Sequence, residues 1–189
     1  MDDKNIDICI SDARNFHNHG MYEDAISLLS SVYVTSPVSL KSAEVYKLLS
    51  SNYRKLGDYD MALININKAI NITKKLRAKS STLNEAELES AICLMNKGII
   101  FEERGESSKA IAIYREALIL FKQLHGENKA ENGIIINSLV TLGIAYYNRS
   151  DFINSRNVLF EALKYFEGER ETDSRYHAII NTINEIDGK

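Results

Sequence analysis

The segment Tyr53-Arg-Lys-Leu-Gly57-Asp-Tyr59-Asp-Met-Ala62 is the best guide to the architecture, because its pattern recurs along the chain. Each copy has an aromatic residue, a glycine or serine four positions later, an aromatic residue or serine two positions after that, and a small residue three positions further on. The other copies begin at Phe16, Phe101 and Tyr146. Repetition of this kind predicts a stack of similar supersecondary units.

Each unit is expected to be a pair of antiparallel helices joined by a tight turn. The glycine permits the sharp turn between the two helices. Small residues in both helices let the two backbones approach closely, and large residues fill the space beside them. The small positions lie seven before the marker glycine or serine and five after it, at Ala13, Ser50, Gly98, Gly143, Ala25, Ala62, Ala110 and Ser155.

With these columns filled, the chain resembles the tetratricopeptide repeat family. The stretch from Ala43 to Lys74 matches best, and the first unit ends in the family's proline, Pro37. The fourth unit departs from the pattern at Ser150 and Ser155, where the family has glycine and alanine. The resemblance implies an all-α fold, a right-handed superhelix (α-solenoid) of four helical hairpins. We expect the repeats at about residues 5–38, 42–78, 84–125 and 130–167.

The repeats are longer than usual. The markers at positions 20, 57, 105 and 150 are 37, 48 and 45 residues apart, against a usual period of about 34. The surplus is expected in the second helices or in the links that follow them. Thr82 and Glu85 have the spacing of a capping box that would open the next helix. The long repeats, including the Leu124-His-Gly-Glu-Asn128 stretch, are similar to those of kinesin light chains.

A final helix is expected at about residues 172–187. Tyr176, Ile179, Ile180, Ile183 and Ile186 share one face of it. A solenoid needs such a helix to cover its last exposed apolar face, so we predict a C-terminal capping helix in a single domain spanning residues 1–189. The alternative is a docking helix that a partner uses.

Composition excludes several classes of function. The net charge is −3 and the pI is about 5.9, so no overall field recruits nucleic acid. No apolar run approaches 18 residues, so membrane insertion is not expected, and the N-terminus does not resemble a signal peptide. Cys9 and Cys93 lie in apolar helical patterns and read as small buried hydrophobic residues of a reducing compartment. We expect a cytoplasmic location, with the nucleus as the alternative.

No constellation of residues indicates catalysis. His17 and His19 are two apart and do not share a helix face, and no acidic or cysteine pattern of metal type accompanies them. Phosphate-binding glycine loops and nucleophile–base arrangements are absent from the sequence. We therefore predict a protein that is not an enzyme and that has no metal and no cofactor.

The resemblance implies protein binding. In this family the first helices of successive repeats line a concave groove that holds a peptide or helix of a partner protein. Lys47, Arg54 and Lys55 would make one end of the groove basic, which suits an acidic segment with apolar anchors. The simpler alternative is that the apolar residues of this surface only pack on neighbouring helices and bind nothing. These residues are Leu48, Ile99, Val140 and Ile144. The predicted contact residues are Lys47, Leu48, Ser51, Arg54, Asn96, Ile99, Asn137, Thr141, Ile144 and Asn148.

We therefore predict an adaptor or scaffold that binds one or more proteins within a larger assembly. Three alternatives stay open. A co-chaperone clamp for acidic C-terminal tails of heat-shock proteins is matched by Lys47 and Asn96, but Ser51, Asn137 and Thr141 stand where that clamp has asparagine, lysine and arginine. A peptide-sensing regulatory domain has no separate signature. Self-association would use the outer surface or the ends.

Overall fold

The computed structural model describes residues 3–32, 38–78, 83–126, 130–166 and 172–188. These ranges contain nine α-helices and no strand. The helices are α1 (Asp3–Asn18), α2 (Tyr22–Ser31), α3 (Leu40–Lys55), α4 (Tyr59–Arg77), α5 (Leu83–Glu103), α6 (Ser107–Gly126), α7 (Asn132–Asn148), α8 (Phe152–Leu163) and α9 (Ser174–Asp187).

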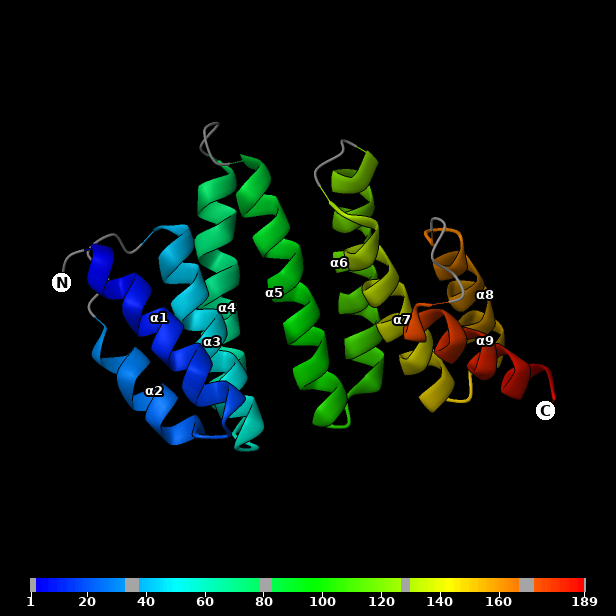
Figure 1. Ribbon diagram of the computed structural model, residues 1–189, viewed down its shortest axis with the longest axis horizontal. Coiled ribbons are helices and arrows are strands. Elements are labelled where there is room, and N and C mark those ends of the chain that lie inside the picture. Colours follow the sequence, from blue (N-terminus) through cyan, green and yellow to red (C-terminus); the bar gives the residue numbers. More distant parts are fainter. Residues whose placement is uncertain (1–2, 33–37, 79–82, 127–129, 167–171, 189) are drawn as a thin grey trace.

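The helices pack in chain order as successive hairpins, so the molecule is a solenoid with its two ends far apart (Figure 1). α1 packs on α2, α3 on α4, α5 on α6 and α7 on α8. The first helices also touch one another, α1 with α3 and α3 with α5. The predicted all-α solenoid of helical hairpins is therefore confirmed.

The four turns inside the hairpins share one backbone design. Gly20, Gly57 and Gly105 have φ of 76°, 78° and 85°, in the left-handed region that glycine adopts freely. In each turn the residue after the marker donates its N–H to the carbonyl of the signature aromatic residue, as in a Schellman helix end. These bonds are Met21 to Phe16, Asp58 to Tyr53, Glu106 to Phe101 and Asp151 to Tyr146, at 2.7–3.0 Å.

The fourth turn keeps this geometry without glycine. Ser150 has φ of 59° and is the one non-glycine residue with positive φ in the described ranges. The serine therefore carries a backbone strain that the three glycines avoid.

The small positions bring paired helices together as predicted. A Cβ placed on Gly98 would lie 2.3 Å from Cε1 of Tyr114, and one on Gly143 would lie 2.7 Å from Cδ2 of Leu159. Where serine replaces alanine, its hydroxyl donates to a carbonyl of the partner helix. The Oγ of Ser50 donates to Ala62 and the Oγ of Ser155 to Gly143, both at 2.8 Å. Ser155 thus fits a column that normally holds alanine.

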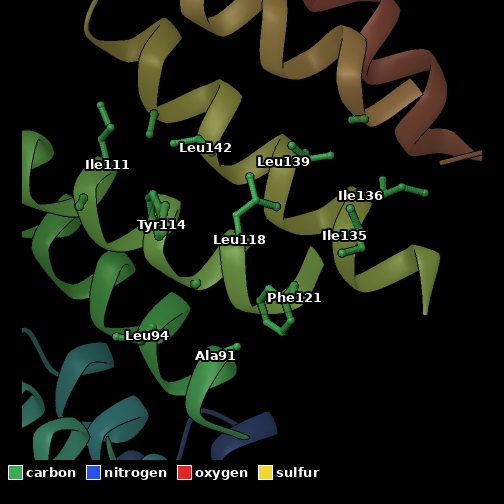
Figure 2. Packing of buried hydrophobic residues seen from close by; sticks show 14 of the residues in the cluster. Ala91, Leu94, Ile111, Tyr114, Leu118, Phe121, Ile135, Ile136, Leu139 and Leu142 are labelled. Carbon is green, nitrogen blue, oxygen red and sulfur yellow. The ribbon is translucent and has the colours of Figure 1, made fainter. Parts of the chain in front are cut away.

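The core is a chain of apolar clusters that follows the stack. The largest runs from α4 to α9, and Figure 2 shows part of it where α5, α6 and α7 meet. Tyr114, Phe121 and Leu139 are among its fully buried side chains. A second cluster joins α1, α2 and α3.

The surplus length of the later repeats lies in the helices. α4 has 19 residues, α5 has 21 and α6 has 20, whereas α2 has 10. The predicted lengthening of second helices is therefore confirmed for α4 and α6. The first helix α5 is longer as well. Pro37 and the capping residue Thr82 lie outside the described residues.

The terminal helix α9 closes the stack. Ile179, Ile183 and Ile186 are buried on its inner face, as the sequence predicts. An ion pair and a hydrogen bond also connect α9 to the last hairpin. Arg156 of α8 pairs with Asp187 at 2.6 Å, and Tyr147 of α7 donates to Glu185 at 3.2 Å.

Candidate functional site

A hollow of about 540 Å³ opens between the first helices of the first three hairpins. We call it the α1/α3/α5 hollow. Three elements that are distant in sequence meet there because α1, α3 and α5 lie next to one another in the stack. Its lining residues are Asp7, Ile10, Ser11, Arg14, Leu40, Lys41, Glu44, Glu85, Leu88 and Glu89.

The lining combines an apolar floor with charged walls. Ile10 is buried, and Leu40 and Leu88 are half-buried. The remaining residues are polar or charged. A concave surface of this composition, with apolar side chains and a few convergent polar groups, is the usual form of a ligand site.

An ion-pair network joins the three helices beneath and beside the hollow. The guanidinium of Arg14 on α1 lies 2.8 Å from a carboxylate oxygen of Glu44 on α3. The ammonium of Lys47 lies 2.5 Å from the other oxygen of Glu44 and 2.6 Å from Glu89 on α5. The network therefore links all three walls.

Charge pairing controls protonation in this network. Burial alone would raise the pKa of Glu44, but Lys47 and Arg14 outweigh it and hold that pKa below its ordinary value. Burial alone would lower the pKa of Lys47, but Glu89 and Glu44 outweigh it and raise that pKa. Both groups are therefore held in their charged forms near neutral pH.

The two cysteines are buried free thiols. Cys93 lies under the network, with its Sγ 3.9 Å from Oε1 of Glu89. Burial, followed by the charge of Glu89, raises the pKa of Cys93 to about 12. A thiol held in this protonated form is a poor nucleophile, which agrees with the interpretation of these cysteines as small packing residues.

The expected basic end of the groove is neutralised by its neighbours. The side chain of Lys47 is 16% exposed and is shared between two carboxylates. Arg54 forms an ion pair with Glu103 of α5. Of the three predicted cations, Lys55 is exposed at the end of α3.

The other predicted contact residues are spread along the stack. Leu48 and Ile99 are half-buried and pack against the apolar clusters, as the simpler packing interpretation expects. Ser51, Asn96 and Thr141 are also half-buried, whereas Asn148 is exposed. Their role in binding stays a prediction.

Two of the predicted residues on α7 have different surroundings: Asn137 contacts the terminal helix, and Ile144 is exposed. Asn137 accepts a hydrogen bond from Arg175 of α9 at 3.0 Å. Ile144 is 45% exposed. None of the ten predicted contact residues lines the α1/α3/α5 hollow.

The hollow lies further toward the N-terminal ends of α3 and α5 than the sequence analysis placed the site. Glu44 precedes Lys47 by three residues and Leu48 by four, so it continues the same helix face by one turn. On α5, Leu88 and Glu89 precede the predicted residue Asn96 by eight and seven positions, which is about two helical turns. Extending each predicted face by one or two turns toward its N-terminus would have found these residues.

Within the described residues, no group of three or more His, Cys, Asp or Glu side chains is arranged to hold a metal ion. In the same ranges, no helix has both the length and the apolar character needed to cross a bilayer.

Comparison with known proteins gives a family for one repeat and a fold for the whole chain. The tetratricopeptide repeat family matches residues 43–76, the unit that the sequence pattern also ranks best. No curated protein matches the chain significantly.

Solved structures resemble the chain over nearly its whole length. The apo form of RapI shares 16% identity at a TM-score of 0.74, covering 95% of this chain and 47% of RapI. The Rap conjugation gene regulator of plasmid pLS20, solved in complex with the Phr* peptide, shares 22% identity at a TM-score of 0.63, covering 93% and 45%. A putative kinesin light chain from Podosopora anserina with nearly identical TPR-like repeats shares 12% at a TM-score of 0.70, covering 96% and 84%.

At these identities the likeness establishes the fold alone, and the chain spans about half the length of the two Rap proteins. Tetratricopeptide repeat domains are generally protein–protein interaction modules. Residues 43–76 thus match the tetratricopeptide repeat family, and the chain around them has the fold of a tetratricopeptide-like solenoid.

Proposed function

We propose that this protein is an interaction module that holds a segment of a partner protein in the α1/α3/α5 hollow. The observation that carries the proposal is the hollow itself, with Ile10, Leu40 and Leu88 at its floor and charged side chains around them. Its volume of about 540 Å³ lies within the roughly 300–1,000 Å³ typical of ligand sites. It offers room for one or two side chains of an extended segment, with the backbone along the rim.

The hollow is preformed by interactions that do not need a ligand. Lys47 fixes α3 to α5, and Arg14 fixes α1 to α3. Preorganised walls reduce the ordering cost of binding. The likeness of the fold to a Rap regulator solved with a peptide supports segment binding as the general mode.

The charge distribution weighs against the co-chaperone alternative. A clamp for a terminal carboxylate needs free cations, and Lys47, the best-matched clamp residue, is already shared by Glu44 and Glu89. An incoming carboxylate would have to displace one of these two acids.

Site-specific photocrosslinking in native extract tests the proposal. A photoreactive amino acid replaces Ser11, an exposed residue of α1 that lines the hollow, or Asn67, an exposed residue of α4 outside it. Both are exposed polar helical positions, so the two variants form a matched pair. We expect a defined partner to crosslink from position 11 and not from position 67. Crosslinking from position 67 alone, or from neither, would contradict the proposal.

A further inference from the structure

The charges around the α1/α3/α5 hollow do not cancel. Asp7 pairs with Lys41 at 2.8 Å. The network described above balances Arg14 and Lys47 against Glu44 and Glu89. This leaves Glu85, which forms no ion pair with another residue of the described ranges. Glu85 is exposed on the first turn of α5.

We propose that the hollow selects a segment that carries a lysine or arginine next to an apolar side chain, with Glu85 receiving the cation. The inference rests on the proposed function and names the chemistry of the partner. It reverses the acidic segment expected from the sequence, because Lys47 and Arg54, two of the three cations that suggested such a segment, are already paired.

The geometry of α5 places the two required features together. Glu85, Leu88 and Glu89 are three and four positions apart and therefore share one helix face, and all three line the hollow. An apolar side chain inserted over Leu88 and Ile10 brings its neighbour in the segment to the rim, where Glu85 lies. A guanidinium there forms charge-assisted bonds to the carboxylate of Glu85, which is in no ion pair with another described residue.

A segment with an acidic residue meets the opposite situation. Its carboxylate would face Glu85 and Glu89 on one wall and Asp7 and Glu44 on the others. The two cations that line the hollow, Arg14 and Lys41, are already paired with Glu44 and Asp7. Lys47, beside them on α3, is 16% exposed and is shared by two acids. Repulsion between like charges disfavours binding of an acidic segment.

Selection from a display library of random dodecapeptides tests the inference on the full chain. Four proteins are used as bait besides the wild type. Glu85→Lys reverses the rim charge, and Glu116→Lys makes the same change in net charge on an exposed position of α6. Ser11→Trp fills the hollow, and Asn67→Trp places the same side chain outside it. Circular dichroism confirms that each variant is folded.

The wild type is expected to enrich peptides with Lys or Arg beside a large apolar residue. Glu85→Lys should lose that preference and gain Asp or Glu, while Glu116→Lys keeps the wild-type preference. For an individual selected peptide, Glu85→Gln should raise Kd by about 3–10-fold, and added salt should reduce the difference.

Two failures are distinguishable. Peptides that are lost with Ser11→Trp and kept with Asn67→Trp, but that show no basic preference or show one unchanged by Glu85→Lys, overturn this inference and leave the proposed function standing. Peptides that bind Ser11→Trp as well as the wild type, or a library that yields no binder, overturn both.

Discussion

The ammonium of Lys47 on α3 lies 2.6 Å from a carboxylate oxygen of Glu89 on α5, and the two side chains are each 16% exposed. This ion pair connects the second and third hairpins beside the α1/α3/α5 hollow, which Glu89 lines. Because the pair is largely withdrawn from water, removing one partner strands the other in a partly desolvated site.

Replacing Lys47 with Met should lower the free energy of unfolding by about 1–3 kcal/mol, since both Glu44 and Glu89 lose a partner. Urea denaturation followed by circular dichroism measures the change. Lys41→Met is the matched control on the same helix, because the Lys41–Asp7 pair is 39% and 60% exposed and should be worth about 0–1 kcal/mol. If both variants lost the same free energy of unfolding, the Lys47 network would contribute no more to stability than an exposed ion pair.

The stability contributed by this network should depend on pH at both ends. The pKa of Glu44 is lowered in the folded state, so its contribution is present above the unfolded value of about 4.5 and is lost as pH falls through the folded value. The pKa of Lys47 is raised, so its contribution is present below about 10.5 and is lost as pH rises further.

Urea denaturation of wild type and Lys47→Met across this range checks the signs. The difference in free energy of unfolding should be constant near neutral pH and shrink below pH 4.5. A difference that persists at full size at pH 3 would mean that the loss comes from packing of the lysine stem and not from its charge.

Ser150→Gly should stabilise the protein by about 0.5–1 kcal/mol, because serine adopts a left-handed conformation at φ 59° that glycine reaches without steric cost. Gly57→Ala, at φ 78° in the equivalent turn, should destabilise by about 1 kcal/mol. No atom lies within 4 Å of a Cβ added at Gly57, so the expected loss is conformational. Thermal melting gives both values, and a destabilising Ser150→Gly would contradict the strain.

Gly98→Ala should cost about 1–3 kcal/mol by overpacking, and Gly98→Leu should cost more. The added Cβ would lie 2.3 Å from the ring of the fully buried Tyr114. Gly133→Ala is the control within another first helix, where the nearest atom is Arg175 Nη1 at 3.8 Å. That variant should be unchanged or up to about 1 kcal/mol more stable. Chemical denaturation would contradict the packing account if Gly98→Ala were as stable as wild type.

The repeat pattern predicted the hairpins because it specifies contacts within one unit. Gly98 and Tyr114 stand in columns of opposite size, and Ser150 stands in the turn column, so their positions could be read by alignment of the copies. The cap was readable for a similar reason, since the isoleucines of α9 have helical spacing. In each of these cases the residues belong to the same helix or the same hairpin, so they are close in the sequence.

The site could not be predicted to the same depth because it depends on contacts between units. Lys47 and Glu89 belong to different repeats, and their pairing requires the offset between α3 and α5, which the sequence pattern does not specify. The extra length of α5 adds more than one turn at its N-terminal end, where Glu85 lies. A cation that looks free in the sequence, such as Lys47 or Arg54, is therefore paired in the fold.

Methyl NMR during titration with a selected dodecapeptide shows whether the segment binds in the α1/α3/α5 hollow. The chain carries ¹³C-labelled isoleucine and leucine methyl groups. Ile10, Leu40 and Leu88 report on the α1/α3/α5 hollow, while Ile119 and Ile153, exposed at 58% and 77% on α6 and α8, report on distant surface. We expect saturable chemical-shift changes at Ile10, Leu40 and Leu88, with the signals of Ile119 and Ile153 unchanged. Shifts at Ile119 or Ile153, with the hollow methyl signals in place, would contradict it.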